Sequence, residues 1–128
     1  GVKFPHLPSG IFEDASDEIS GYPCPQPLLS RDGRKLLSDR VVGSKFCIFT
    51  RDGIPKVSNK AEKIIEALDI QIVKLSAEDD EENRMEKIFS LYKLILVRPD
   101  RYVYGGIESL DDASKIIESL ETTFCLKI

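Results

Sequence analysis

The sequence has very few of the side chains on which most active sites depend. Among its 128 residues there is one histidine, His6, and no tryptophan. The three cysteines, Cys24, Cys47 and Cys125, never occur as a C-x-x-C pair. An odd number of widely spaced cysteines argues against a disulfide framework, a zinc site and a dithiol redox centre. A triad or a histidine base would depend on a single side chain. A reducing compartment, the cytoplasm, fits this content best.

Long apolar runs, basic clusters and phosphate-binding loops are also missing. No window approaches the roughly 18 consecutive apolar residues that a membrane-spanning helix requires, and no basic stretch followed by an apolar run marks the N-terminus. Eighteen basic and 22 acidic residues give a net charge of -4, so neither a membrane nor a nucleic acid is an expected partner. Neither G-x-G-x-x-G nor G-x-x-x-x-G-K-[ST] occurs, which leaves no nucleotide cradle.

What remains is the composition of one ordinary globular domain. Hydrophobic residues make up 41% of the chain and charged residues 31%, and a chain of this length can bury a single core. Five of the seven prolines fall within residues 1–27, and proline lacks the backbone donor that regular structure needs. We therefore predict a proline-rich lead-in arm over residues 1–27 and a folded domain over residues 28–128.

Periodicity predicts alternating strands and helices along this domain. Branched and aromatic runs bounded by turn residues predict strands, and apolar residues spaced by three and four predict amphipathic helices. In chain order we expect a small hairpin turning at residues 31–34, a strand over 45–50, a helix capped by Ser58, a strand over 70–75, a helix carrying Met85, Ile88, Phe89 and Tyr92, a hairpin of 94–97 with 102–104 that ends at Gly105-Gly106, and a helix that begins with Ser109 and Asp112 as a capping box.

This order predicts an α/β, thioredoxin-like fold with a mixed central sheet, helices on both faces and no C-x-x-C. A strand, a helix and a strand imply a parallel crossover, and the later hairpin is antiparallel. In redox enzymes of this fold the nucleophilic cysteine lies where the first core strand runs into its helix, because the helix N-terminus lowers the pKa of the thiol. Here residues 51–55 read Arg-Asp-Gly-Ile-Pro, without sulfur.

None of the other polar groups is predicted to be catalytic. Cys47 lies within a buried strand, where a free cysteine usually acts as an apolar filler. Cys24 is expected to be more exposed, but its proline-flanked loop offers neither a base nor a helix end, and Cys125 lies near a chain end. The acidic residues 78–82 and 111–112 are explained as helix starts, where they favour the macrodipole. We predict no catalytic, metal-binding or cofactor-binding residue in this chain.

Several motifs, taken in order, resemble a known family. They are the P-Q-P of residues 25–27, the R-D-G of residues 31–33 and, most specifically, the hairpin L-V-R-P-D-R-Y-V of residues 96–103. The chain is similar over roughly residues 21–121 to the C-terminal thioredoxin-like domain of FAD-dependent aromatic-ring hydroxylases, the group of phenol 2-monooxygenase and 3-(3-hydroxyphenyl)propionate hydroxylase.

The resemblance implies an accessory C-terminal domain rather than a complete enzyme. Such a domain packs on the flavin-binding domain of the same chain and sometimes on a second subunit. Catalysis, with FAD reduced by NADPH or NADH, would then belong to upstream domains. The only methionine is Met85, so we do not expect Gly1 to be the start of translation. Two alternatives stay open: a freestanding, non-redox thioredoxin-like module that binds another protein, and a redox protein that uses a single cysteine.

Within the resemblance, Arg98, Pro99 and Asp100 carry the most specific part. Their chemistry favours a turn with a local ion pair. The alternative is a contact with the flavin domain, since arginine is favoured in bidentate pairing at interfaces. Relatives often have glycine where this chain has Arg101, which suggests a different turn geometry here.

Overall fold

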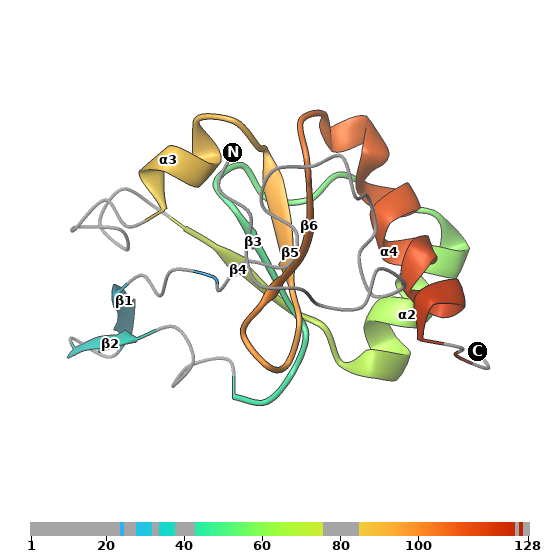
Figure 1. Cartoon of the computed structure of the whole chain (residues 1–128), viewed down its shortest axis with the longest axis horizontal. Helices are drawn as coiled ribbons and strands as arrows, with labels where there is room; N and C mark the ends of the chain where they lie inside the picture. The colour runs from blue at the N-terminus through green and yellow to red at the C-terminus, as the bar shows by residue number, and fades with distance from the viewer. Residues whose placement is uncertain are drawn as a thin grey trace.

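The structure, a computed structural model, describes residues 24, 28–31, 34–37, 43–75, 85–124 and 126, with the backbone alone for the two short N-terminal strands and for Lys87 (Figure 1). The described elements are β1 (Leu28–Arg31), β2 (Arg34–Leu37), β3 (Cys47–Thr50), α2 (Asn59–Leu68), β4 (Gln71–Lys74), α3 (Glu86–Phe89), β5 (Leu94–Val97), β6 (Val103–Ile107), the 3-10 turn η2 (Leu110–Asp112) and α4 (Ala113–Thr123). The predicted order of strands and helices is confirmed. Apart from Cys24, the predicted arm lies outside the described residues.

Four strands form a mixed sheet in the order β4-β3-β5-β6. Strands β3 and β4 are parallel, and the connection between them passes through α2, as parallel neighbours require. Strand β5 is antiparallel to both β3 and β6. Among the described strands, β1 and β2 pair with each other alone, as a two-stranded antiparallel ribbon. The α/β, thioredoxin-like plan predicted from the sequence is therefore the observed one.

Helices cover both faces of this sheet. Helices α2 and α4 lie side by side on one face, and α3 lies on the other (Figure 1). Because successive side chains of a strand point to opposite faces, β5 contributes to two cores. Leu94 and Leu96 pack beneath α2 and α4, whereas Ile95 and Val97 pack on the α3 side. All four are buried, as expected of an interior strand covered on both faces.

The two long helices begin in different ways. The Oγ of Ser58 accepts a hydrogen bond from the backbone N–H of Ala61 at 3.1 Å, which is the predicted cap of α2. The last helix starts differently from the prediction, because a 3-10 turn precedes α4. The Oγ of Ser109 accepts from the N–H of Asp111 at 3.3 Å, and the side chain of Asp112 makes no capping bond.

Two further boundaries differ from the sequence-based expectation. Strand β6 does not end at Gly105-Gly106 but continues to Ile107, because pairing with β5 needs only backbone groups, which glycine also has. Helix α3 is a single turn, and Tyr92 lies beyond it, with its backbone N–H bonded to the carbonyl of Ile88 at 2.9 Å. No described helix is long and apolar enough to cross a membrane.

Candidate functional site

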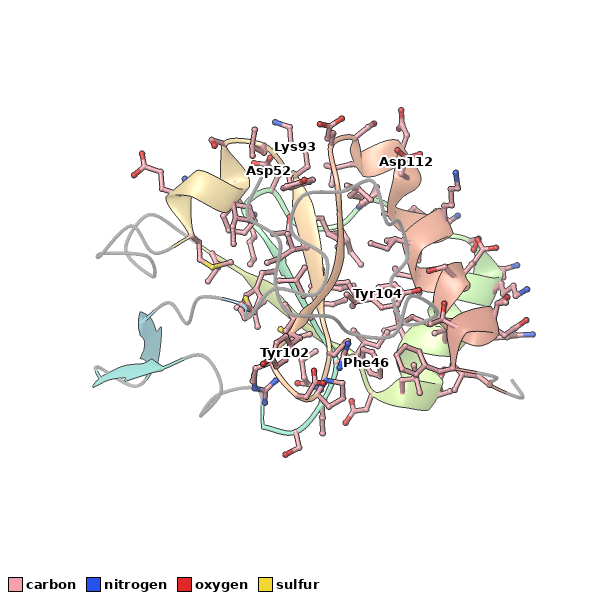
Figure 2. All side chains as sticks on the ribbon, viewed as in Figure 1. Phe46, Asp52, Lys93, Tyr102, Tyr104 and Asp112 are labelled. Carbon is pink, nitrogen blue, oxygen red and sulfur yellow. The ribbon has the colours of Figure 1, made fainter. Side chains whose placement is uncertain are left out.

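The loop between β3 and α2 is where this fold would carry a reactive cysteine. At the end of β3, the fully buried Thr50 places its Oγ1 at 3.0 Å from the carbonyl oxygen of Gly53 and at 3.2 Å from that of Lys93. The hydroxyl therefore ties the loop to the chain that enters β5. Figure 2 shows Asp52 and Lys93 together at this end of the sheet. The loop holds no sulfur, so the thiol chemistry of the fold is not available there.

The N-terminus of α2 does not fit a flavin or nucleotide phosphate either. Besides capping the helix, the Oγ of Ser58 donates to Oε2 of Glu118 at 2.9 Å. Its backbone N–H donates to Oγ of Ser114 at 2.9 Å. An anion at this helix start would meet a carboxylate instead of free N–H groups. The start of α2 therefore does not favour a bound phosphate group.

Both described cysteines lie at the opposite end of the sheet. Cys47 is paired with Val97 at the last residue of β5. The backbone N–H of Cys24 donates to the carbonyl oxygen of Arg101 at 2.8 Å. Cys47 is 0% exposed and Cys24 is 8% exposed, both in the core on the α3 side. The expectation that Cys24 would be more exposed is wrong, because this backbone bond and the packing of its side chain place it inside.

Burial makes these thiols poor nucleophiles. Desolvation raises the pKa of Cys24 to about 12 despite the nearby charge of Arg101. Desolvation, with a smaller contribution from Cys24, also raises the pKa of Cys47 to about 12. The thiolate is the reactive form, so both groups are protonated and unreactive near neutral pH. Cys125 and His6 lie outside the described residues. Within the described ranges, no three His, Cys, Asp or Glu side chains are grouped so as to hold a metal ion.

Arg98, Pro99 and Asp100 form the turn between β5 and β6, at the end of the sheet that carries the cysteines. Figure 2 shows Tyr102 there, away from the loop between β3 and α2. The N–H of Arg101 donates to the carbonyl of Arg98 at 3.0 Å, and the N–H of Arg98 donates to the carbonyl of Tyr102 at 2.9 Å. These two bonds enclose a three-residue hairpin loop, residues 99–101, and the last residue of such a loop is characteristically left-handed.

Arg101 is that left-handed residue, with φ of 72°. A side chain in this conformation costs roughly 1–2 kcal/mol relative to glycine. Arg101 therefore adopts the backbone conformation that a glycine would favour, and a different turn geometry is not needed to explain the replacement. Its Nη1 donates to the carbonyl oxygen of Lys45 at 3.4 Å, which joins the turn to the segment before β3.

Arg98 is the one buried charged side chain among the described residues, at 8% exposure. Its Nη2 forms an ion pair with Oδ2 of Asp100, the local pair expected from the turn. Its guanidinium also lies over the ring of Tyr102, with Cζ at 5.8 Å from the ring centroid. Asp100 uses its other oxygen, Oδ1, to accept the N–H of Tyr102 at 3.2 Å. Buried cation, carboxylate and ring thus form one local unit.

One nitrogen of this guanidinium has no acceptor. Nη1 of Arg98 is buried, and no hydrogen-bond partner lies within reach in the part of the chain that the structure describes. A buried donor left without a partner costs about 1–3 kcal/mol. The motif singled out Arg98, but its burial depends on how the turn folds against the sheet, which no local pattern reveals.

A second ion pair beside the turn was not predicted from the sequence. Nζ of Lys45 pairs with Oδ2 of Asp69, which follows α2. The hydrogen bond and charge of Lys45 lower the pKa of Asp69, and Gln71 adds a smaller hydrogen bond to the same carboxylate. These residues are far apart in sequence, so no spacing signal connects them. We call Lys45, Asp69, Arg98, Asp100 and Arg101 the turn-end cluster.

The chain is similar to a defined family and to parts of two hydroxylases and one flavin-dependent monooxygenase. The family model described as HcaD C-terminal domain matches residues 21–123. No curated protein matches the chain. Among solved structures, a ternary complex of aklavinone-11 hydroxylase with FAD and aklavinone aligns with a TM-score of 0.67 at 21% identity, over 96% of this chain and 26% of that chain.

Two other solved structures share the same fold at similar identity. The flavin-dependent monooxygenase PieE, in complex with FAD and substrate, aligns with a TM-score of 0.65 at 17% identity, over 83% of this chain and 20% of that chain. OxyS anhydrotetracycline hydroxylase from Streptomyces rimosus aligns with a TM-score of 0.52 at 20% identity, over 99% of this chain and 24% of that chain. The chain therefore spans about a quarter or less of these proteins.

Proposed function

This chain belongs to the HcaD C-terminal domain family, and from that membership we propose that it is the accessory C-terminal domain of a flavin-dependent aromatic hydroxylase. Catalysis would take place in flavin-binding domains that precede it on a longer, cytoplasmic polypeptide. The fold shared with parts of PieE and of aklavinone-11 hydroxylase supports this proposal, because in both proteins the matched region is a small share of the chain.

The observation that carries the proposal is the loss of the fold's own chemistry. The loop between β3 and α2 has no sulfur, and the two described cysteines are buried at the other end of the sheet. The start of α2 is capped by its own chain and faces Glu118. The role left to the domain is contact: with the flavin-binding domain of the same polypeptide, and in addition with a second subunit. FAD and NADPH or NADH would serve the parent enzyme.

The turn of Arg98, Pro99 and Asp100 is the proposed contact with the flavin-binding domain. Pro99 and Asp100 are exposed at its tip, and Arg98 anchors them from below. Exposed residues held in one conformation by an ion pair to a buried arginine bind at a low entropic cost. This arrangement supports an interface role alongside the local role of the turn.

The test is to express the full reading frame that contains this chain. We expect a yellow protein with bound flavin, which oxidises NADPH or NADH faster when a hydroxylatable aromatic compound is added. The 128-residue chain alone is the control and should remain colourless. A longer polypeptide without flavin, or a reading frame that encodes nothing more than this domain, would refute the proposal and favour a freestanding binding module.

A further inference from the structure

We propose that Arg98 is the receptor for a carboxylate that the flavin-binding part of the same polypeptide inserts on docking. The inference rests on the proposed function and names the chemistry of the partner group at the turn. It starts from the buried Nη1 of Arg98, which has no acceptor among the described residues. Buried arginine nitrogens are normally hydrogen-bonded, and those that are not require an explanation. A missing partner from outside the domain supplies one.

The charge balance of the turn-end cluster favours an anionic partner. Its members are linked by contacts: Arg98 pairs with Asp100, Arg101 bonds the backbone of Lys45, and Lys45 pairs with Asp69. The cluster contains three cations and two carboxylates, so its net charge is +1. A backbone carbonyl from the partner would accept from Nη1 but would not neutralise this charge. A carboxylate would accept the hydrogen bond and also neutralise the charge.

Access to the guanidinium runs through Asp100. The side chain of Asp100 is 48% exposed, whereas that of Arg98 is 10% exposed, and the pair between them uses Nη2 alone. An incoming carboxylate that displaces Asp100 can accept from Nη1 and Nη2 together, and this bidentate geometry is stronger than a single bond. Asp100 keeps its bond to the N–H of Tyr102 and holds the turn during the exchange.

The test uses the longer polypeptide and compares Arg98→Met with the wild type. Methionine fills similar space without charge. We expect limited proteolysis to release the domain about tenfold faster, the loss expected for one charge-assisted pair, with flavin content unchanged. Lys115→Met, at an exposed position of α4, is the matched control for loss of one positive charge and should not accelerate release.

Two further variants separate docking from a purely structural role. Arg98→Lys keeps the charge but cannot form two parallel bonds, so it should also accelerate release. Asp100→Asn removes the competing charge and should leave release unchanged or slower. In the 128-residue chain, Arg98→Met should not lower the melting temperature, since it removes a buried donor without a partner and leaves Asp100, which is half exposed, in contact with water.

Several outcomes would overturn the inference. If Arg98→Met releases the domain no faster than the wild type, no partner group binds Arg98. If Asp100→Asn accelerates release as much as Arg98→Met, Asp100 itself makes the contact. If Arg98→Met lowers the melting temperature of the short chain, Arg98 serves the fold. A wild-type longer polypeptide without flavin would instead refute the proposed function, which the release rates do not test.

Discussion

At the scale of single residues, Cys47 behaves as a small apolar side chain. This residue of β3 is fully buried in the core on the α3 side of the sheet, and its Sγ lies 3.7 Å from the carbonyl oxygen of Ile48. Such a thiol is stable only in its neutral form, because the thiolate would lose its hydration. The folded state therefore resists deprotonation that the unfolded chain allows.

This burial makes stability depend on pH in the alkaline range. The pKa of Cys47 is about 12 in the folded state and 9.0 in the unfolded reference, so its stabilising effect is complete below about pH 9 and is lost as the pH rises towards 12. In that window the free energy of unfolding should fall by up to about 1.4 kcal/mol per pH unit for this thiol. Urea denaturation of the wild type and of Cys47→Ala across this range measures the effect.

The free energy of unfolding of Cys47→Ala should decline less steeply with pH than that of the wild type, whatever the stability of the variant at neutral pH. Thr50→Val, on the same buried strand but without a thiol change, should keep the wild-type slope. Parallel slopes for wild type and Cys47→Ala would show that the thiol is not desolvated as described.

The burial of some single residues could be predicted from the sequence, and that of others could not. The central position of Cys47 in an apolar run was sufficient to predict its burial. Cys24 sits in a proline-rich segment, where local composition predicts exposure, but its backbone bond to Arg101 and the packing of its side chain in the core place it inside. The burial of Arg98 could not be predicted from the sequence either, because charged side chains mostly lie at the surface.

At the scale of elements, the β5–β6 hairpin carries one backbone strain. Arg101 is left-handed at φ of 72°, a conformation that side chains disfavour. We expect Arg101→Gly to raise the free energy of unfolding by about 0.5–1 kcal/mol, less than the full strain because glycine also loosens the unfolded chain. Chemical denaturation measures this change.

The matched control is the opposite substitution at Gly53, with φ of 82°. No heavy atom lies within 4 Å of a Cβ added there, so Gly53→Ala tests conformational strain without a clash. It should lower stability by about 1 kcal/mol. If Arg101→Gly is destabilising while Gly53→Ala behaves as expected, the bond from Arg101 to Lys45 outweighs the strain.

Elements with strong local periodicity were predicted well, and their ends less well. The cap at Ser58 and the apolar spacing of α2 are properties of adjacent residues, so both were confirmed. Strand β6 extends through Gly105-Gly106 because β5 is present to pair with it. Pairing depends on two strands together, so the sequence of one strand does not determine how many of its residues are paired.

At the scale of the whole molecule, the sheet is shared by two cores. Leu96 faces α2 and α4, and Ile95 faces α3, from adjacent positions of one interior strand. We expect Leu96→Ala and Ile95→Ala each to lower the free energy of unfolding by about 2–5 kcal/mol. In both variants a single transition should remain, since either core unfolds only when the sheet between them does.

Coincident far- and near-ultraviolet circular dichroism transitions measure this cooperativity. The surface variant Lys63→Ala, on the exposed side of α2, should shift neither transition appreciably. Two separate transitions in Ile95→Ala, with the α2 side still folded, would show that the faces are independent units.

The sequence by itself determined the order of strands and helices, the thioredoxin-like plan and the absence of sulfur at the β3–α2 loop, since periodicity, caps and residue identity are local properties. Tertiary structure alone decided that Cys24 and Arg98 are buried and that Lys45, Asp69 and Arg101 meet beside the turn. These contacts depend on which strand termini lie together at one end of the sheet. That arrangement follows from packing two faces at once, and no single segment encodes it.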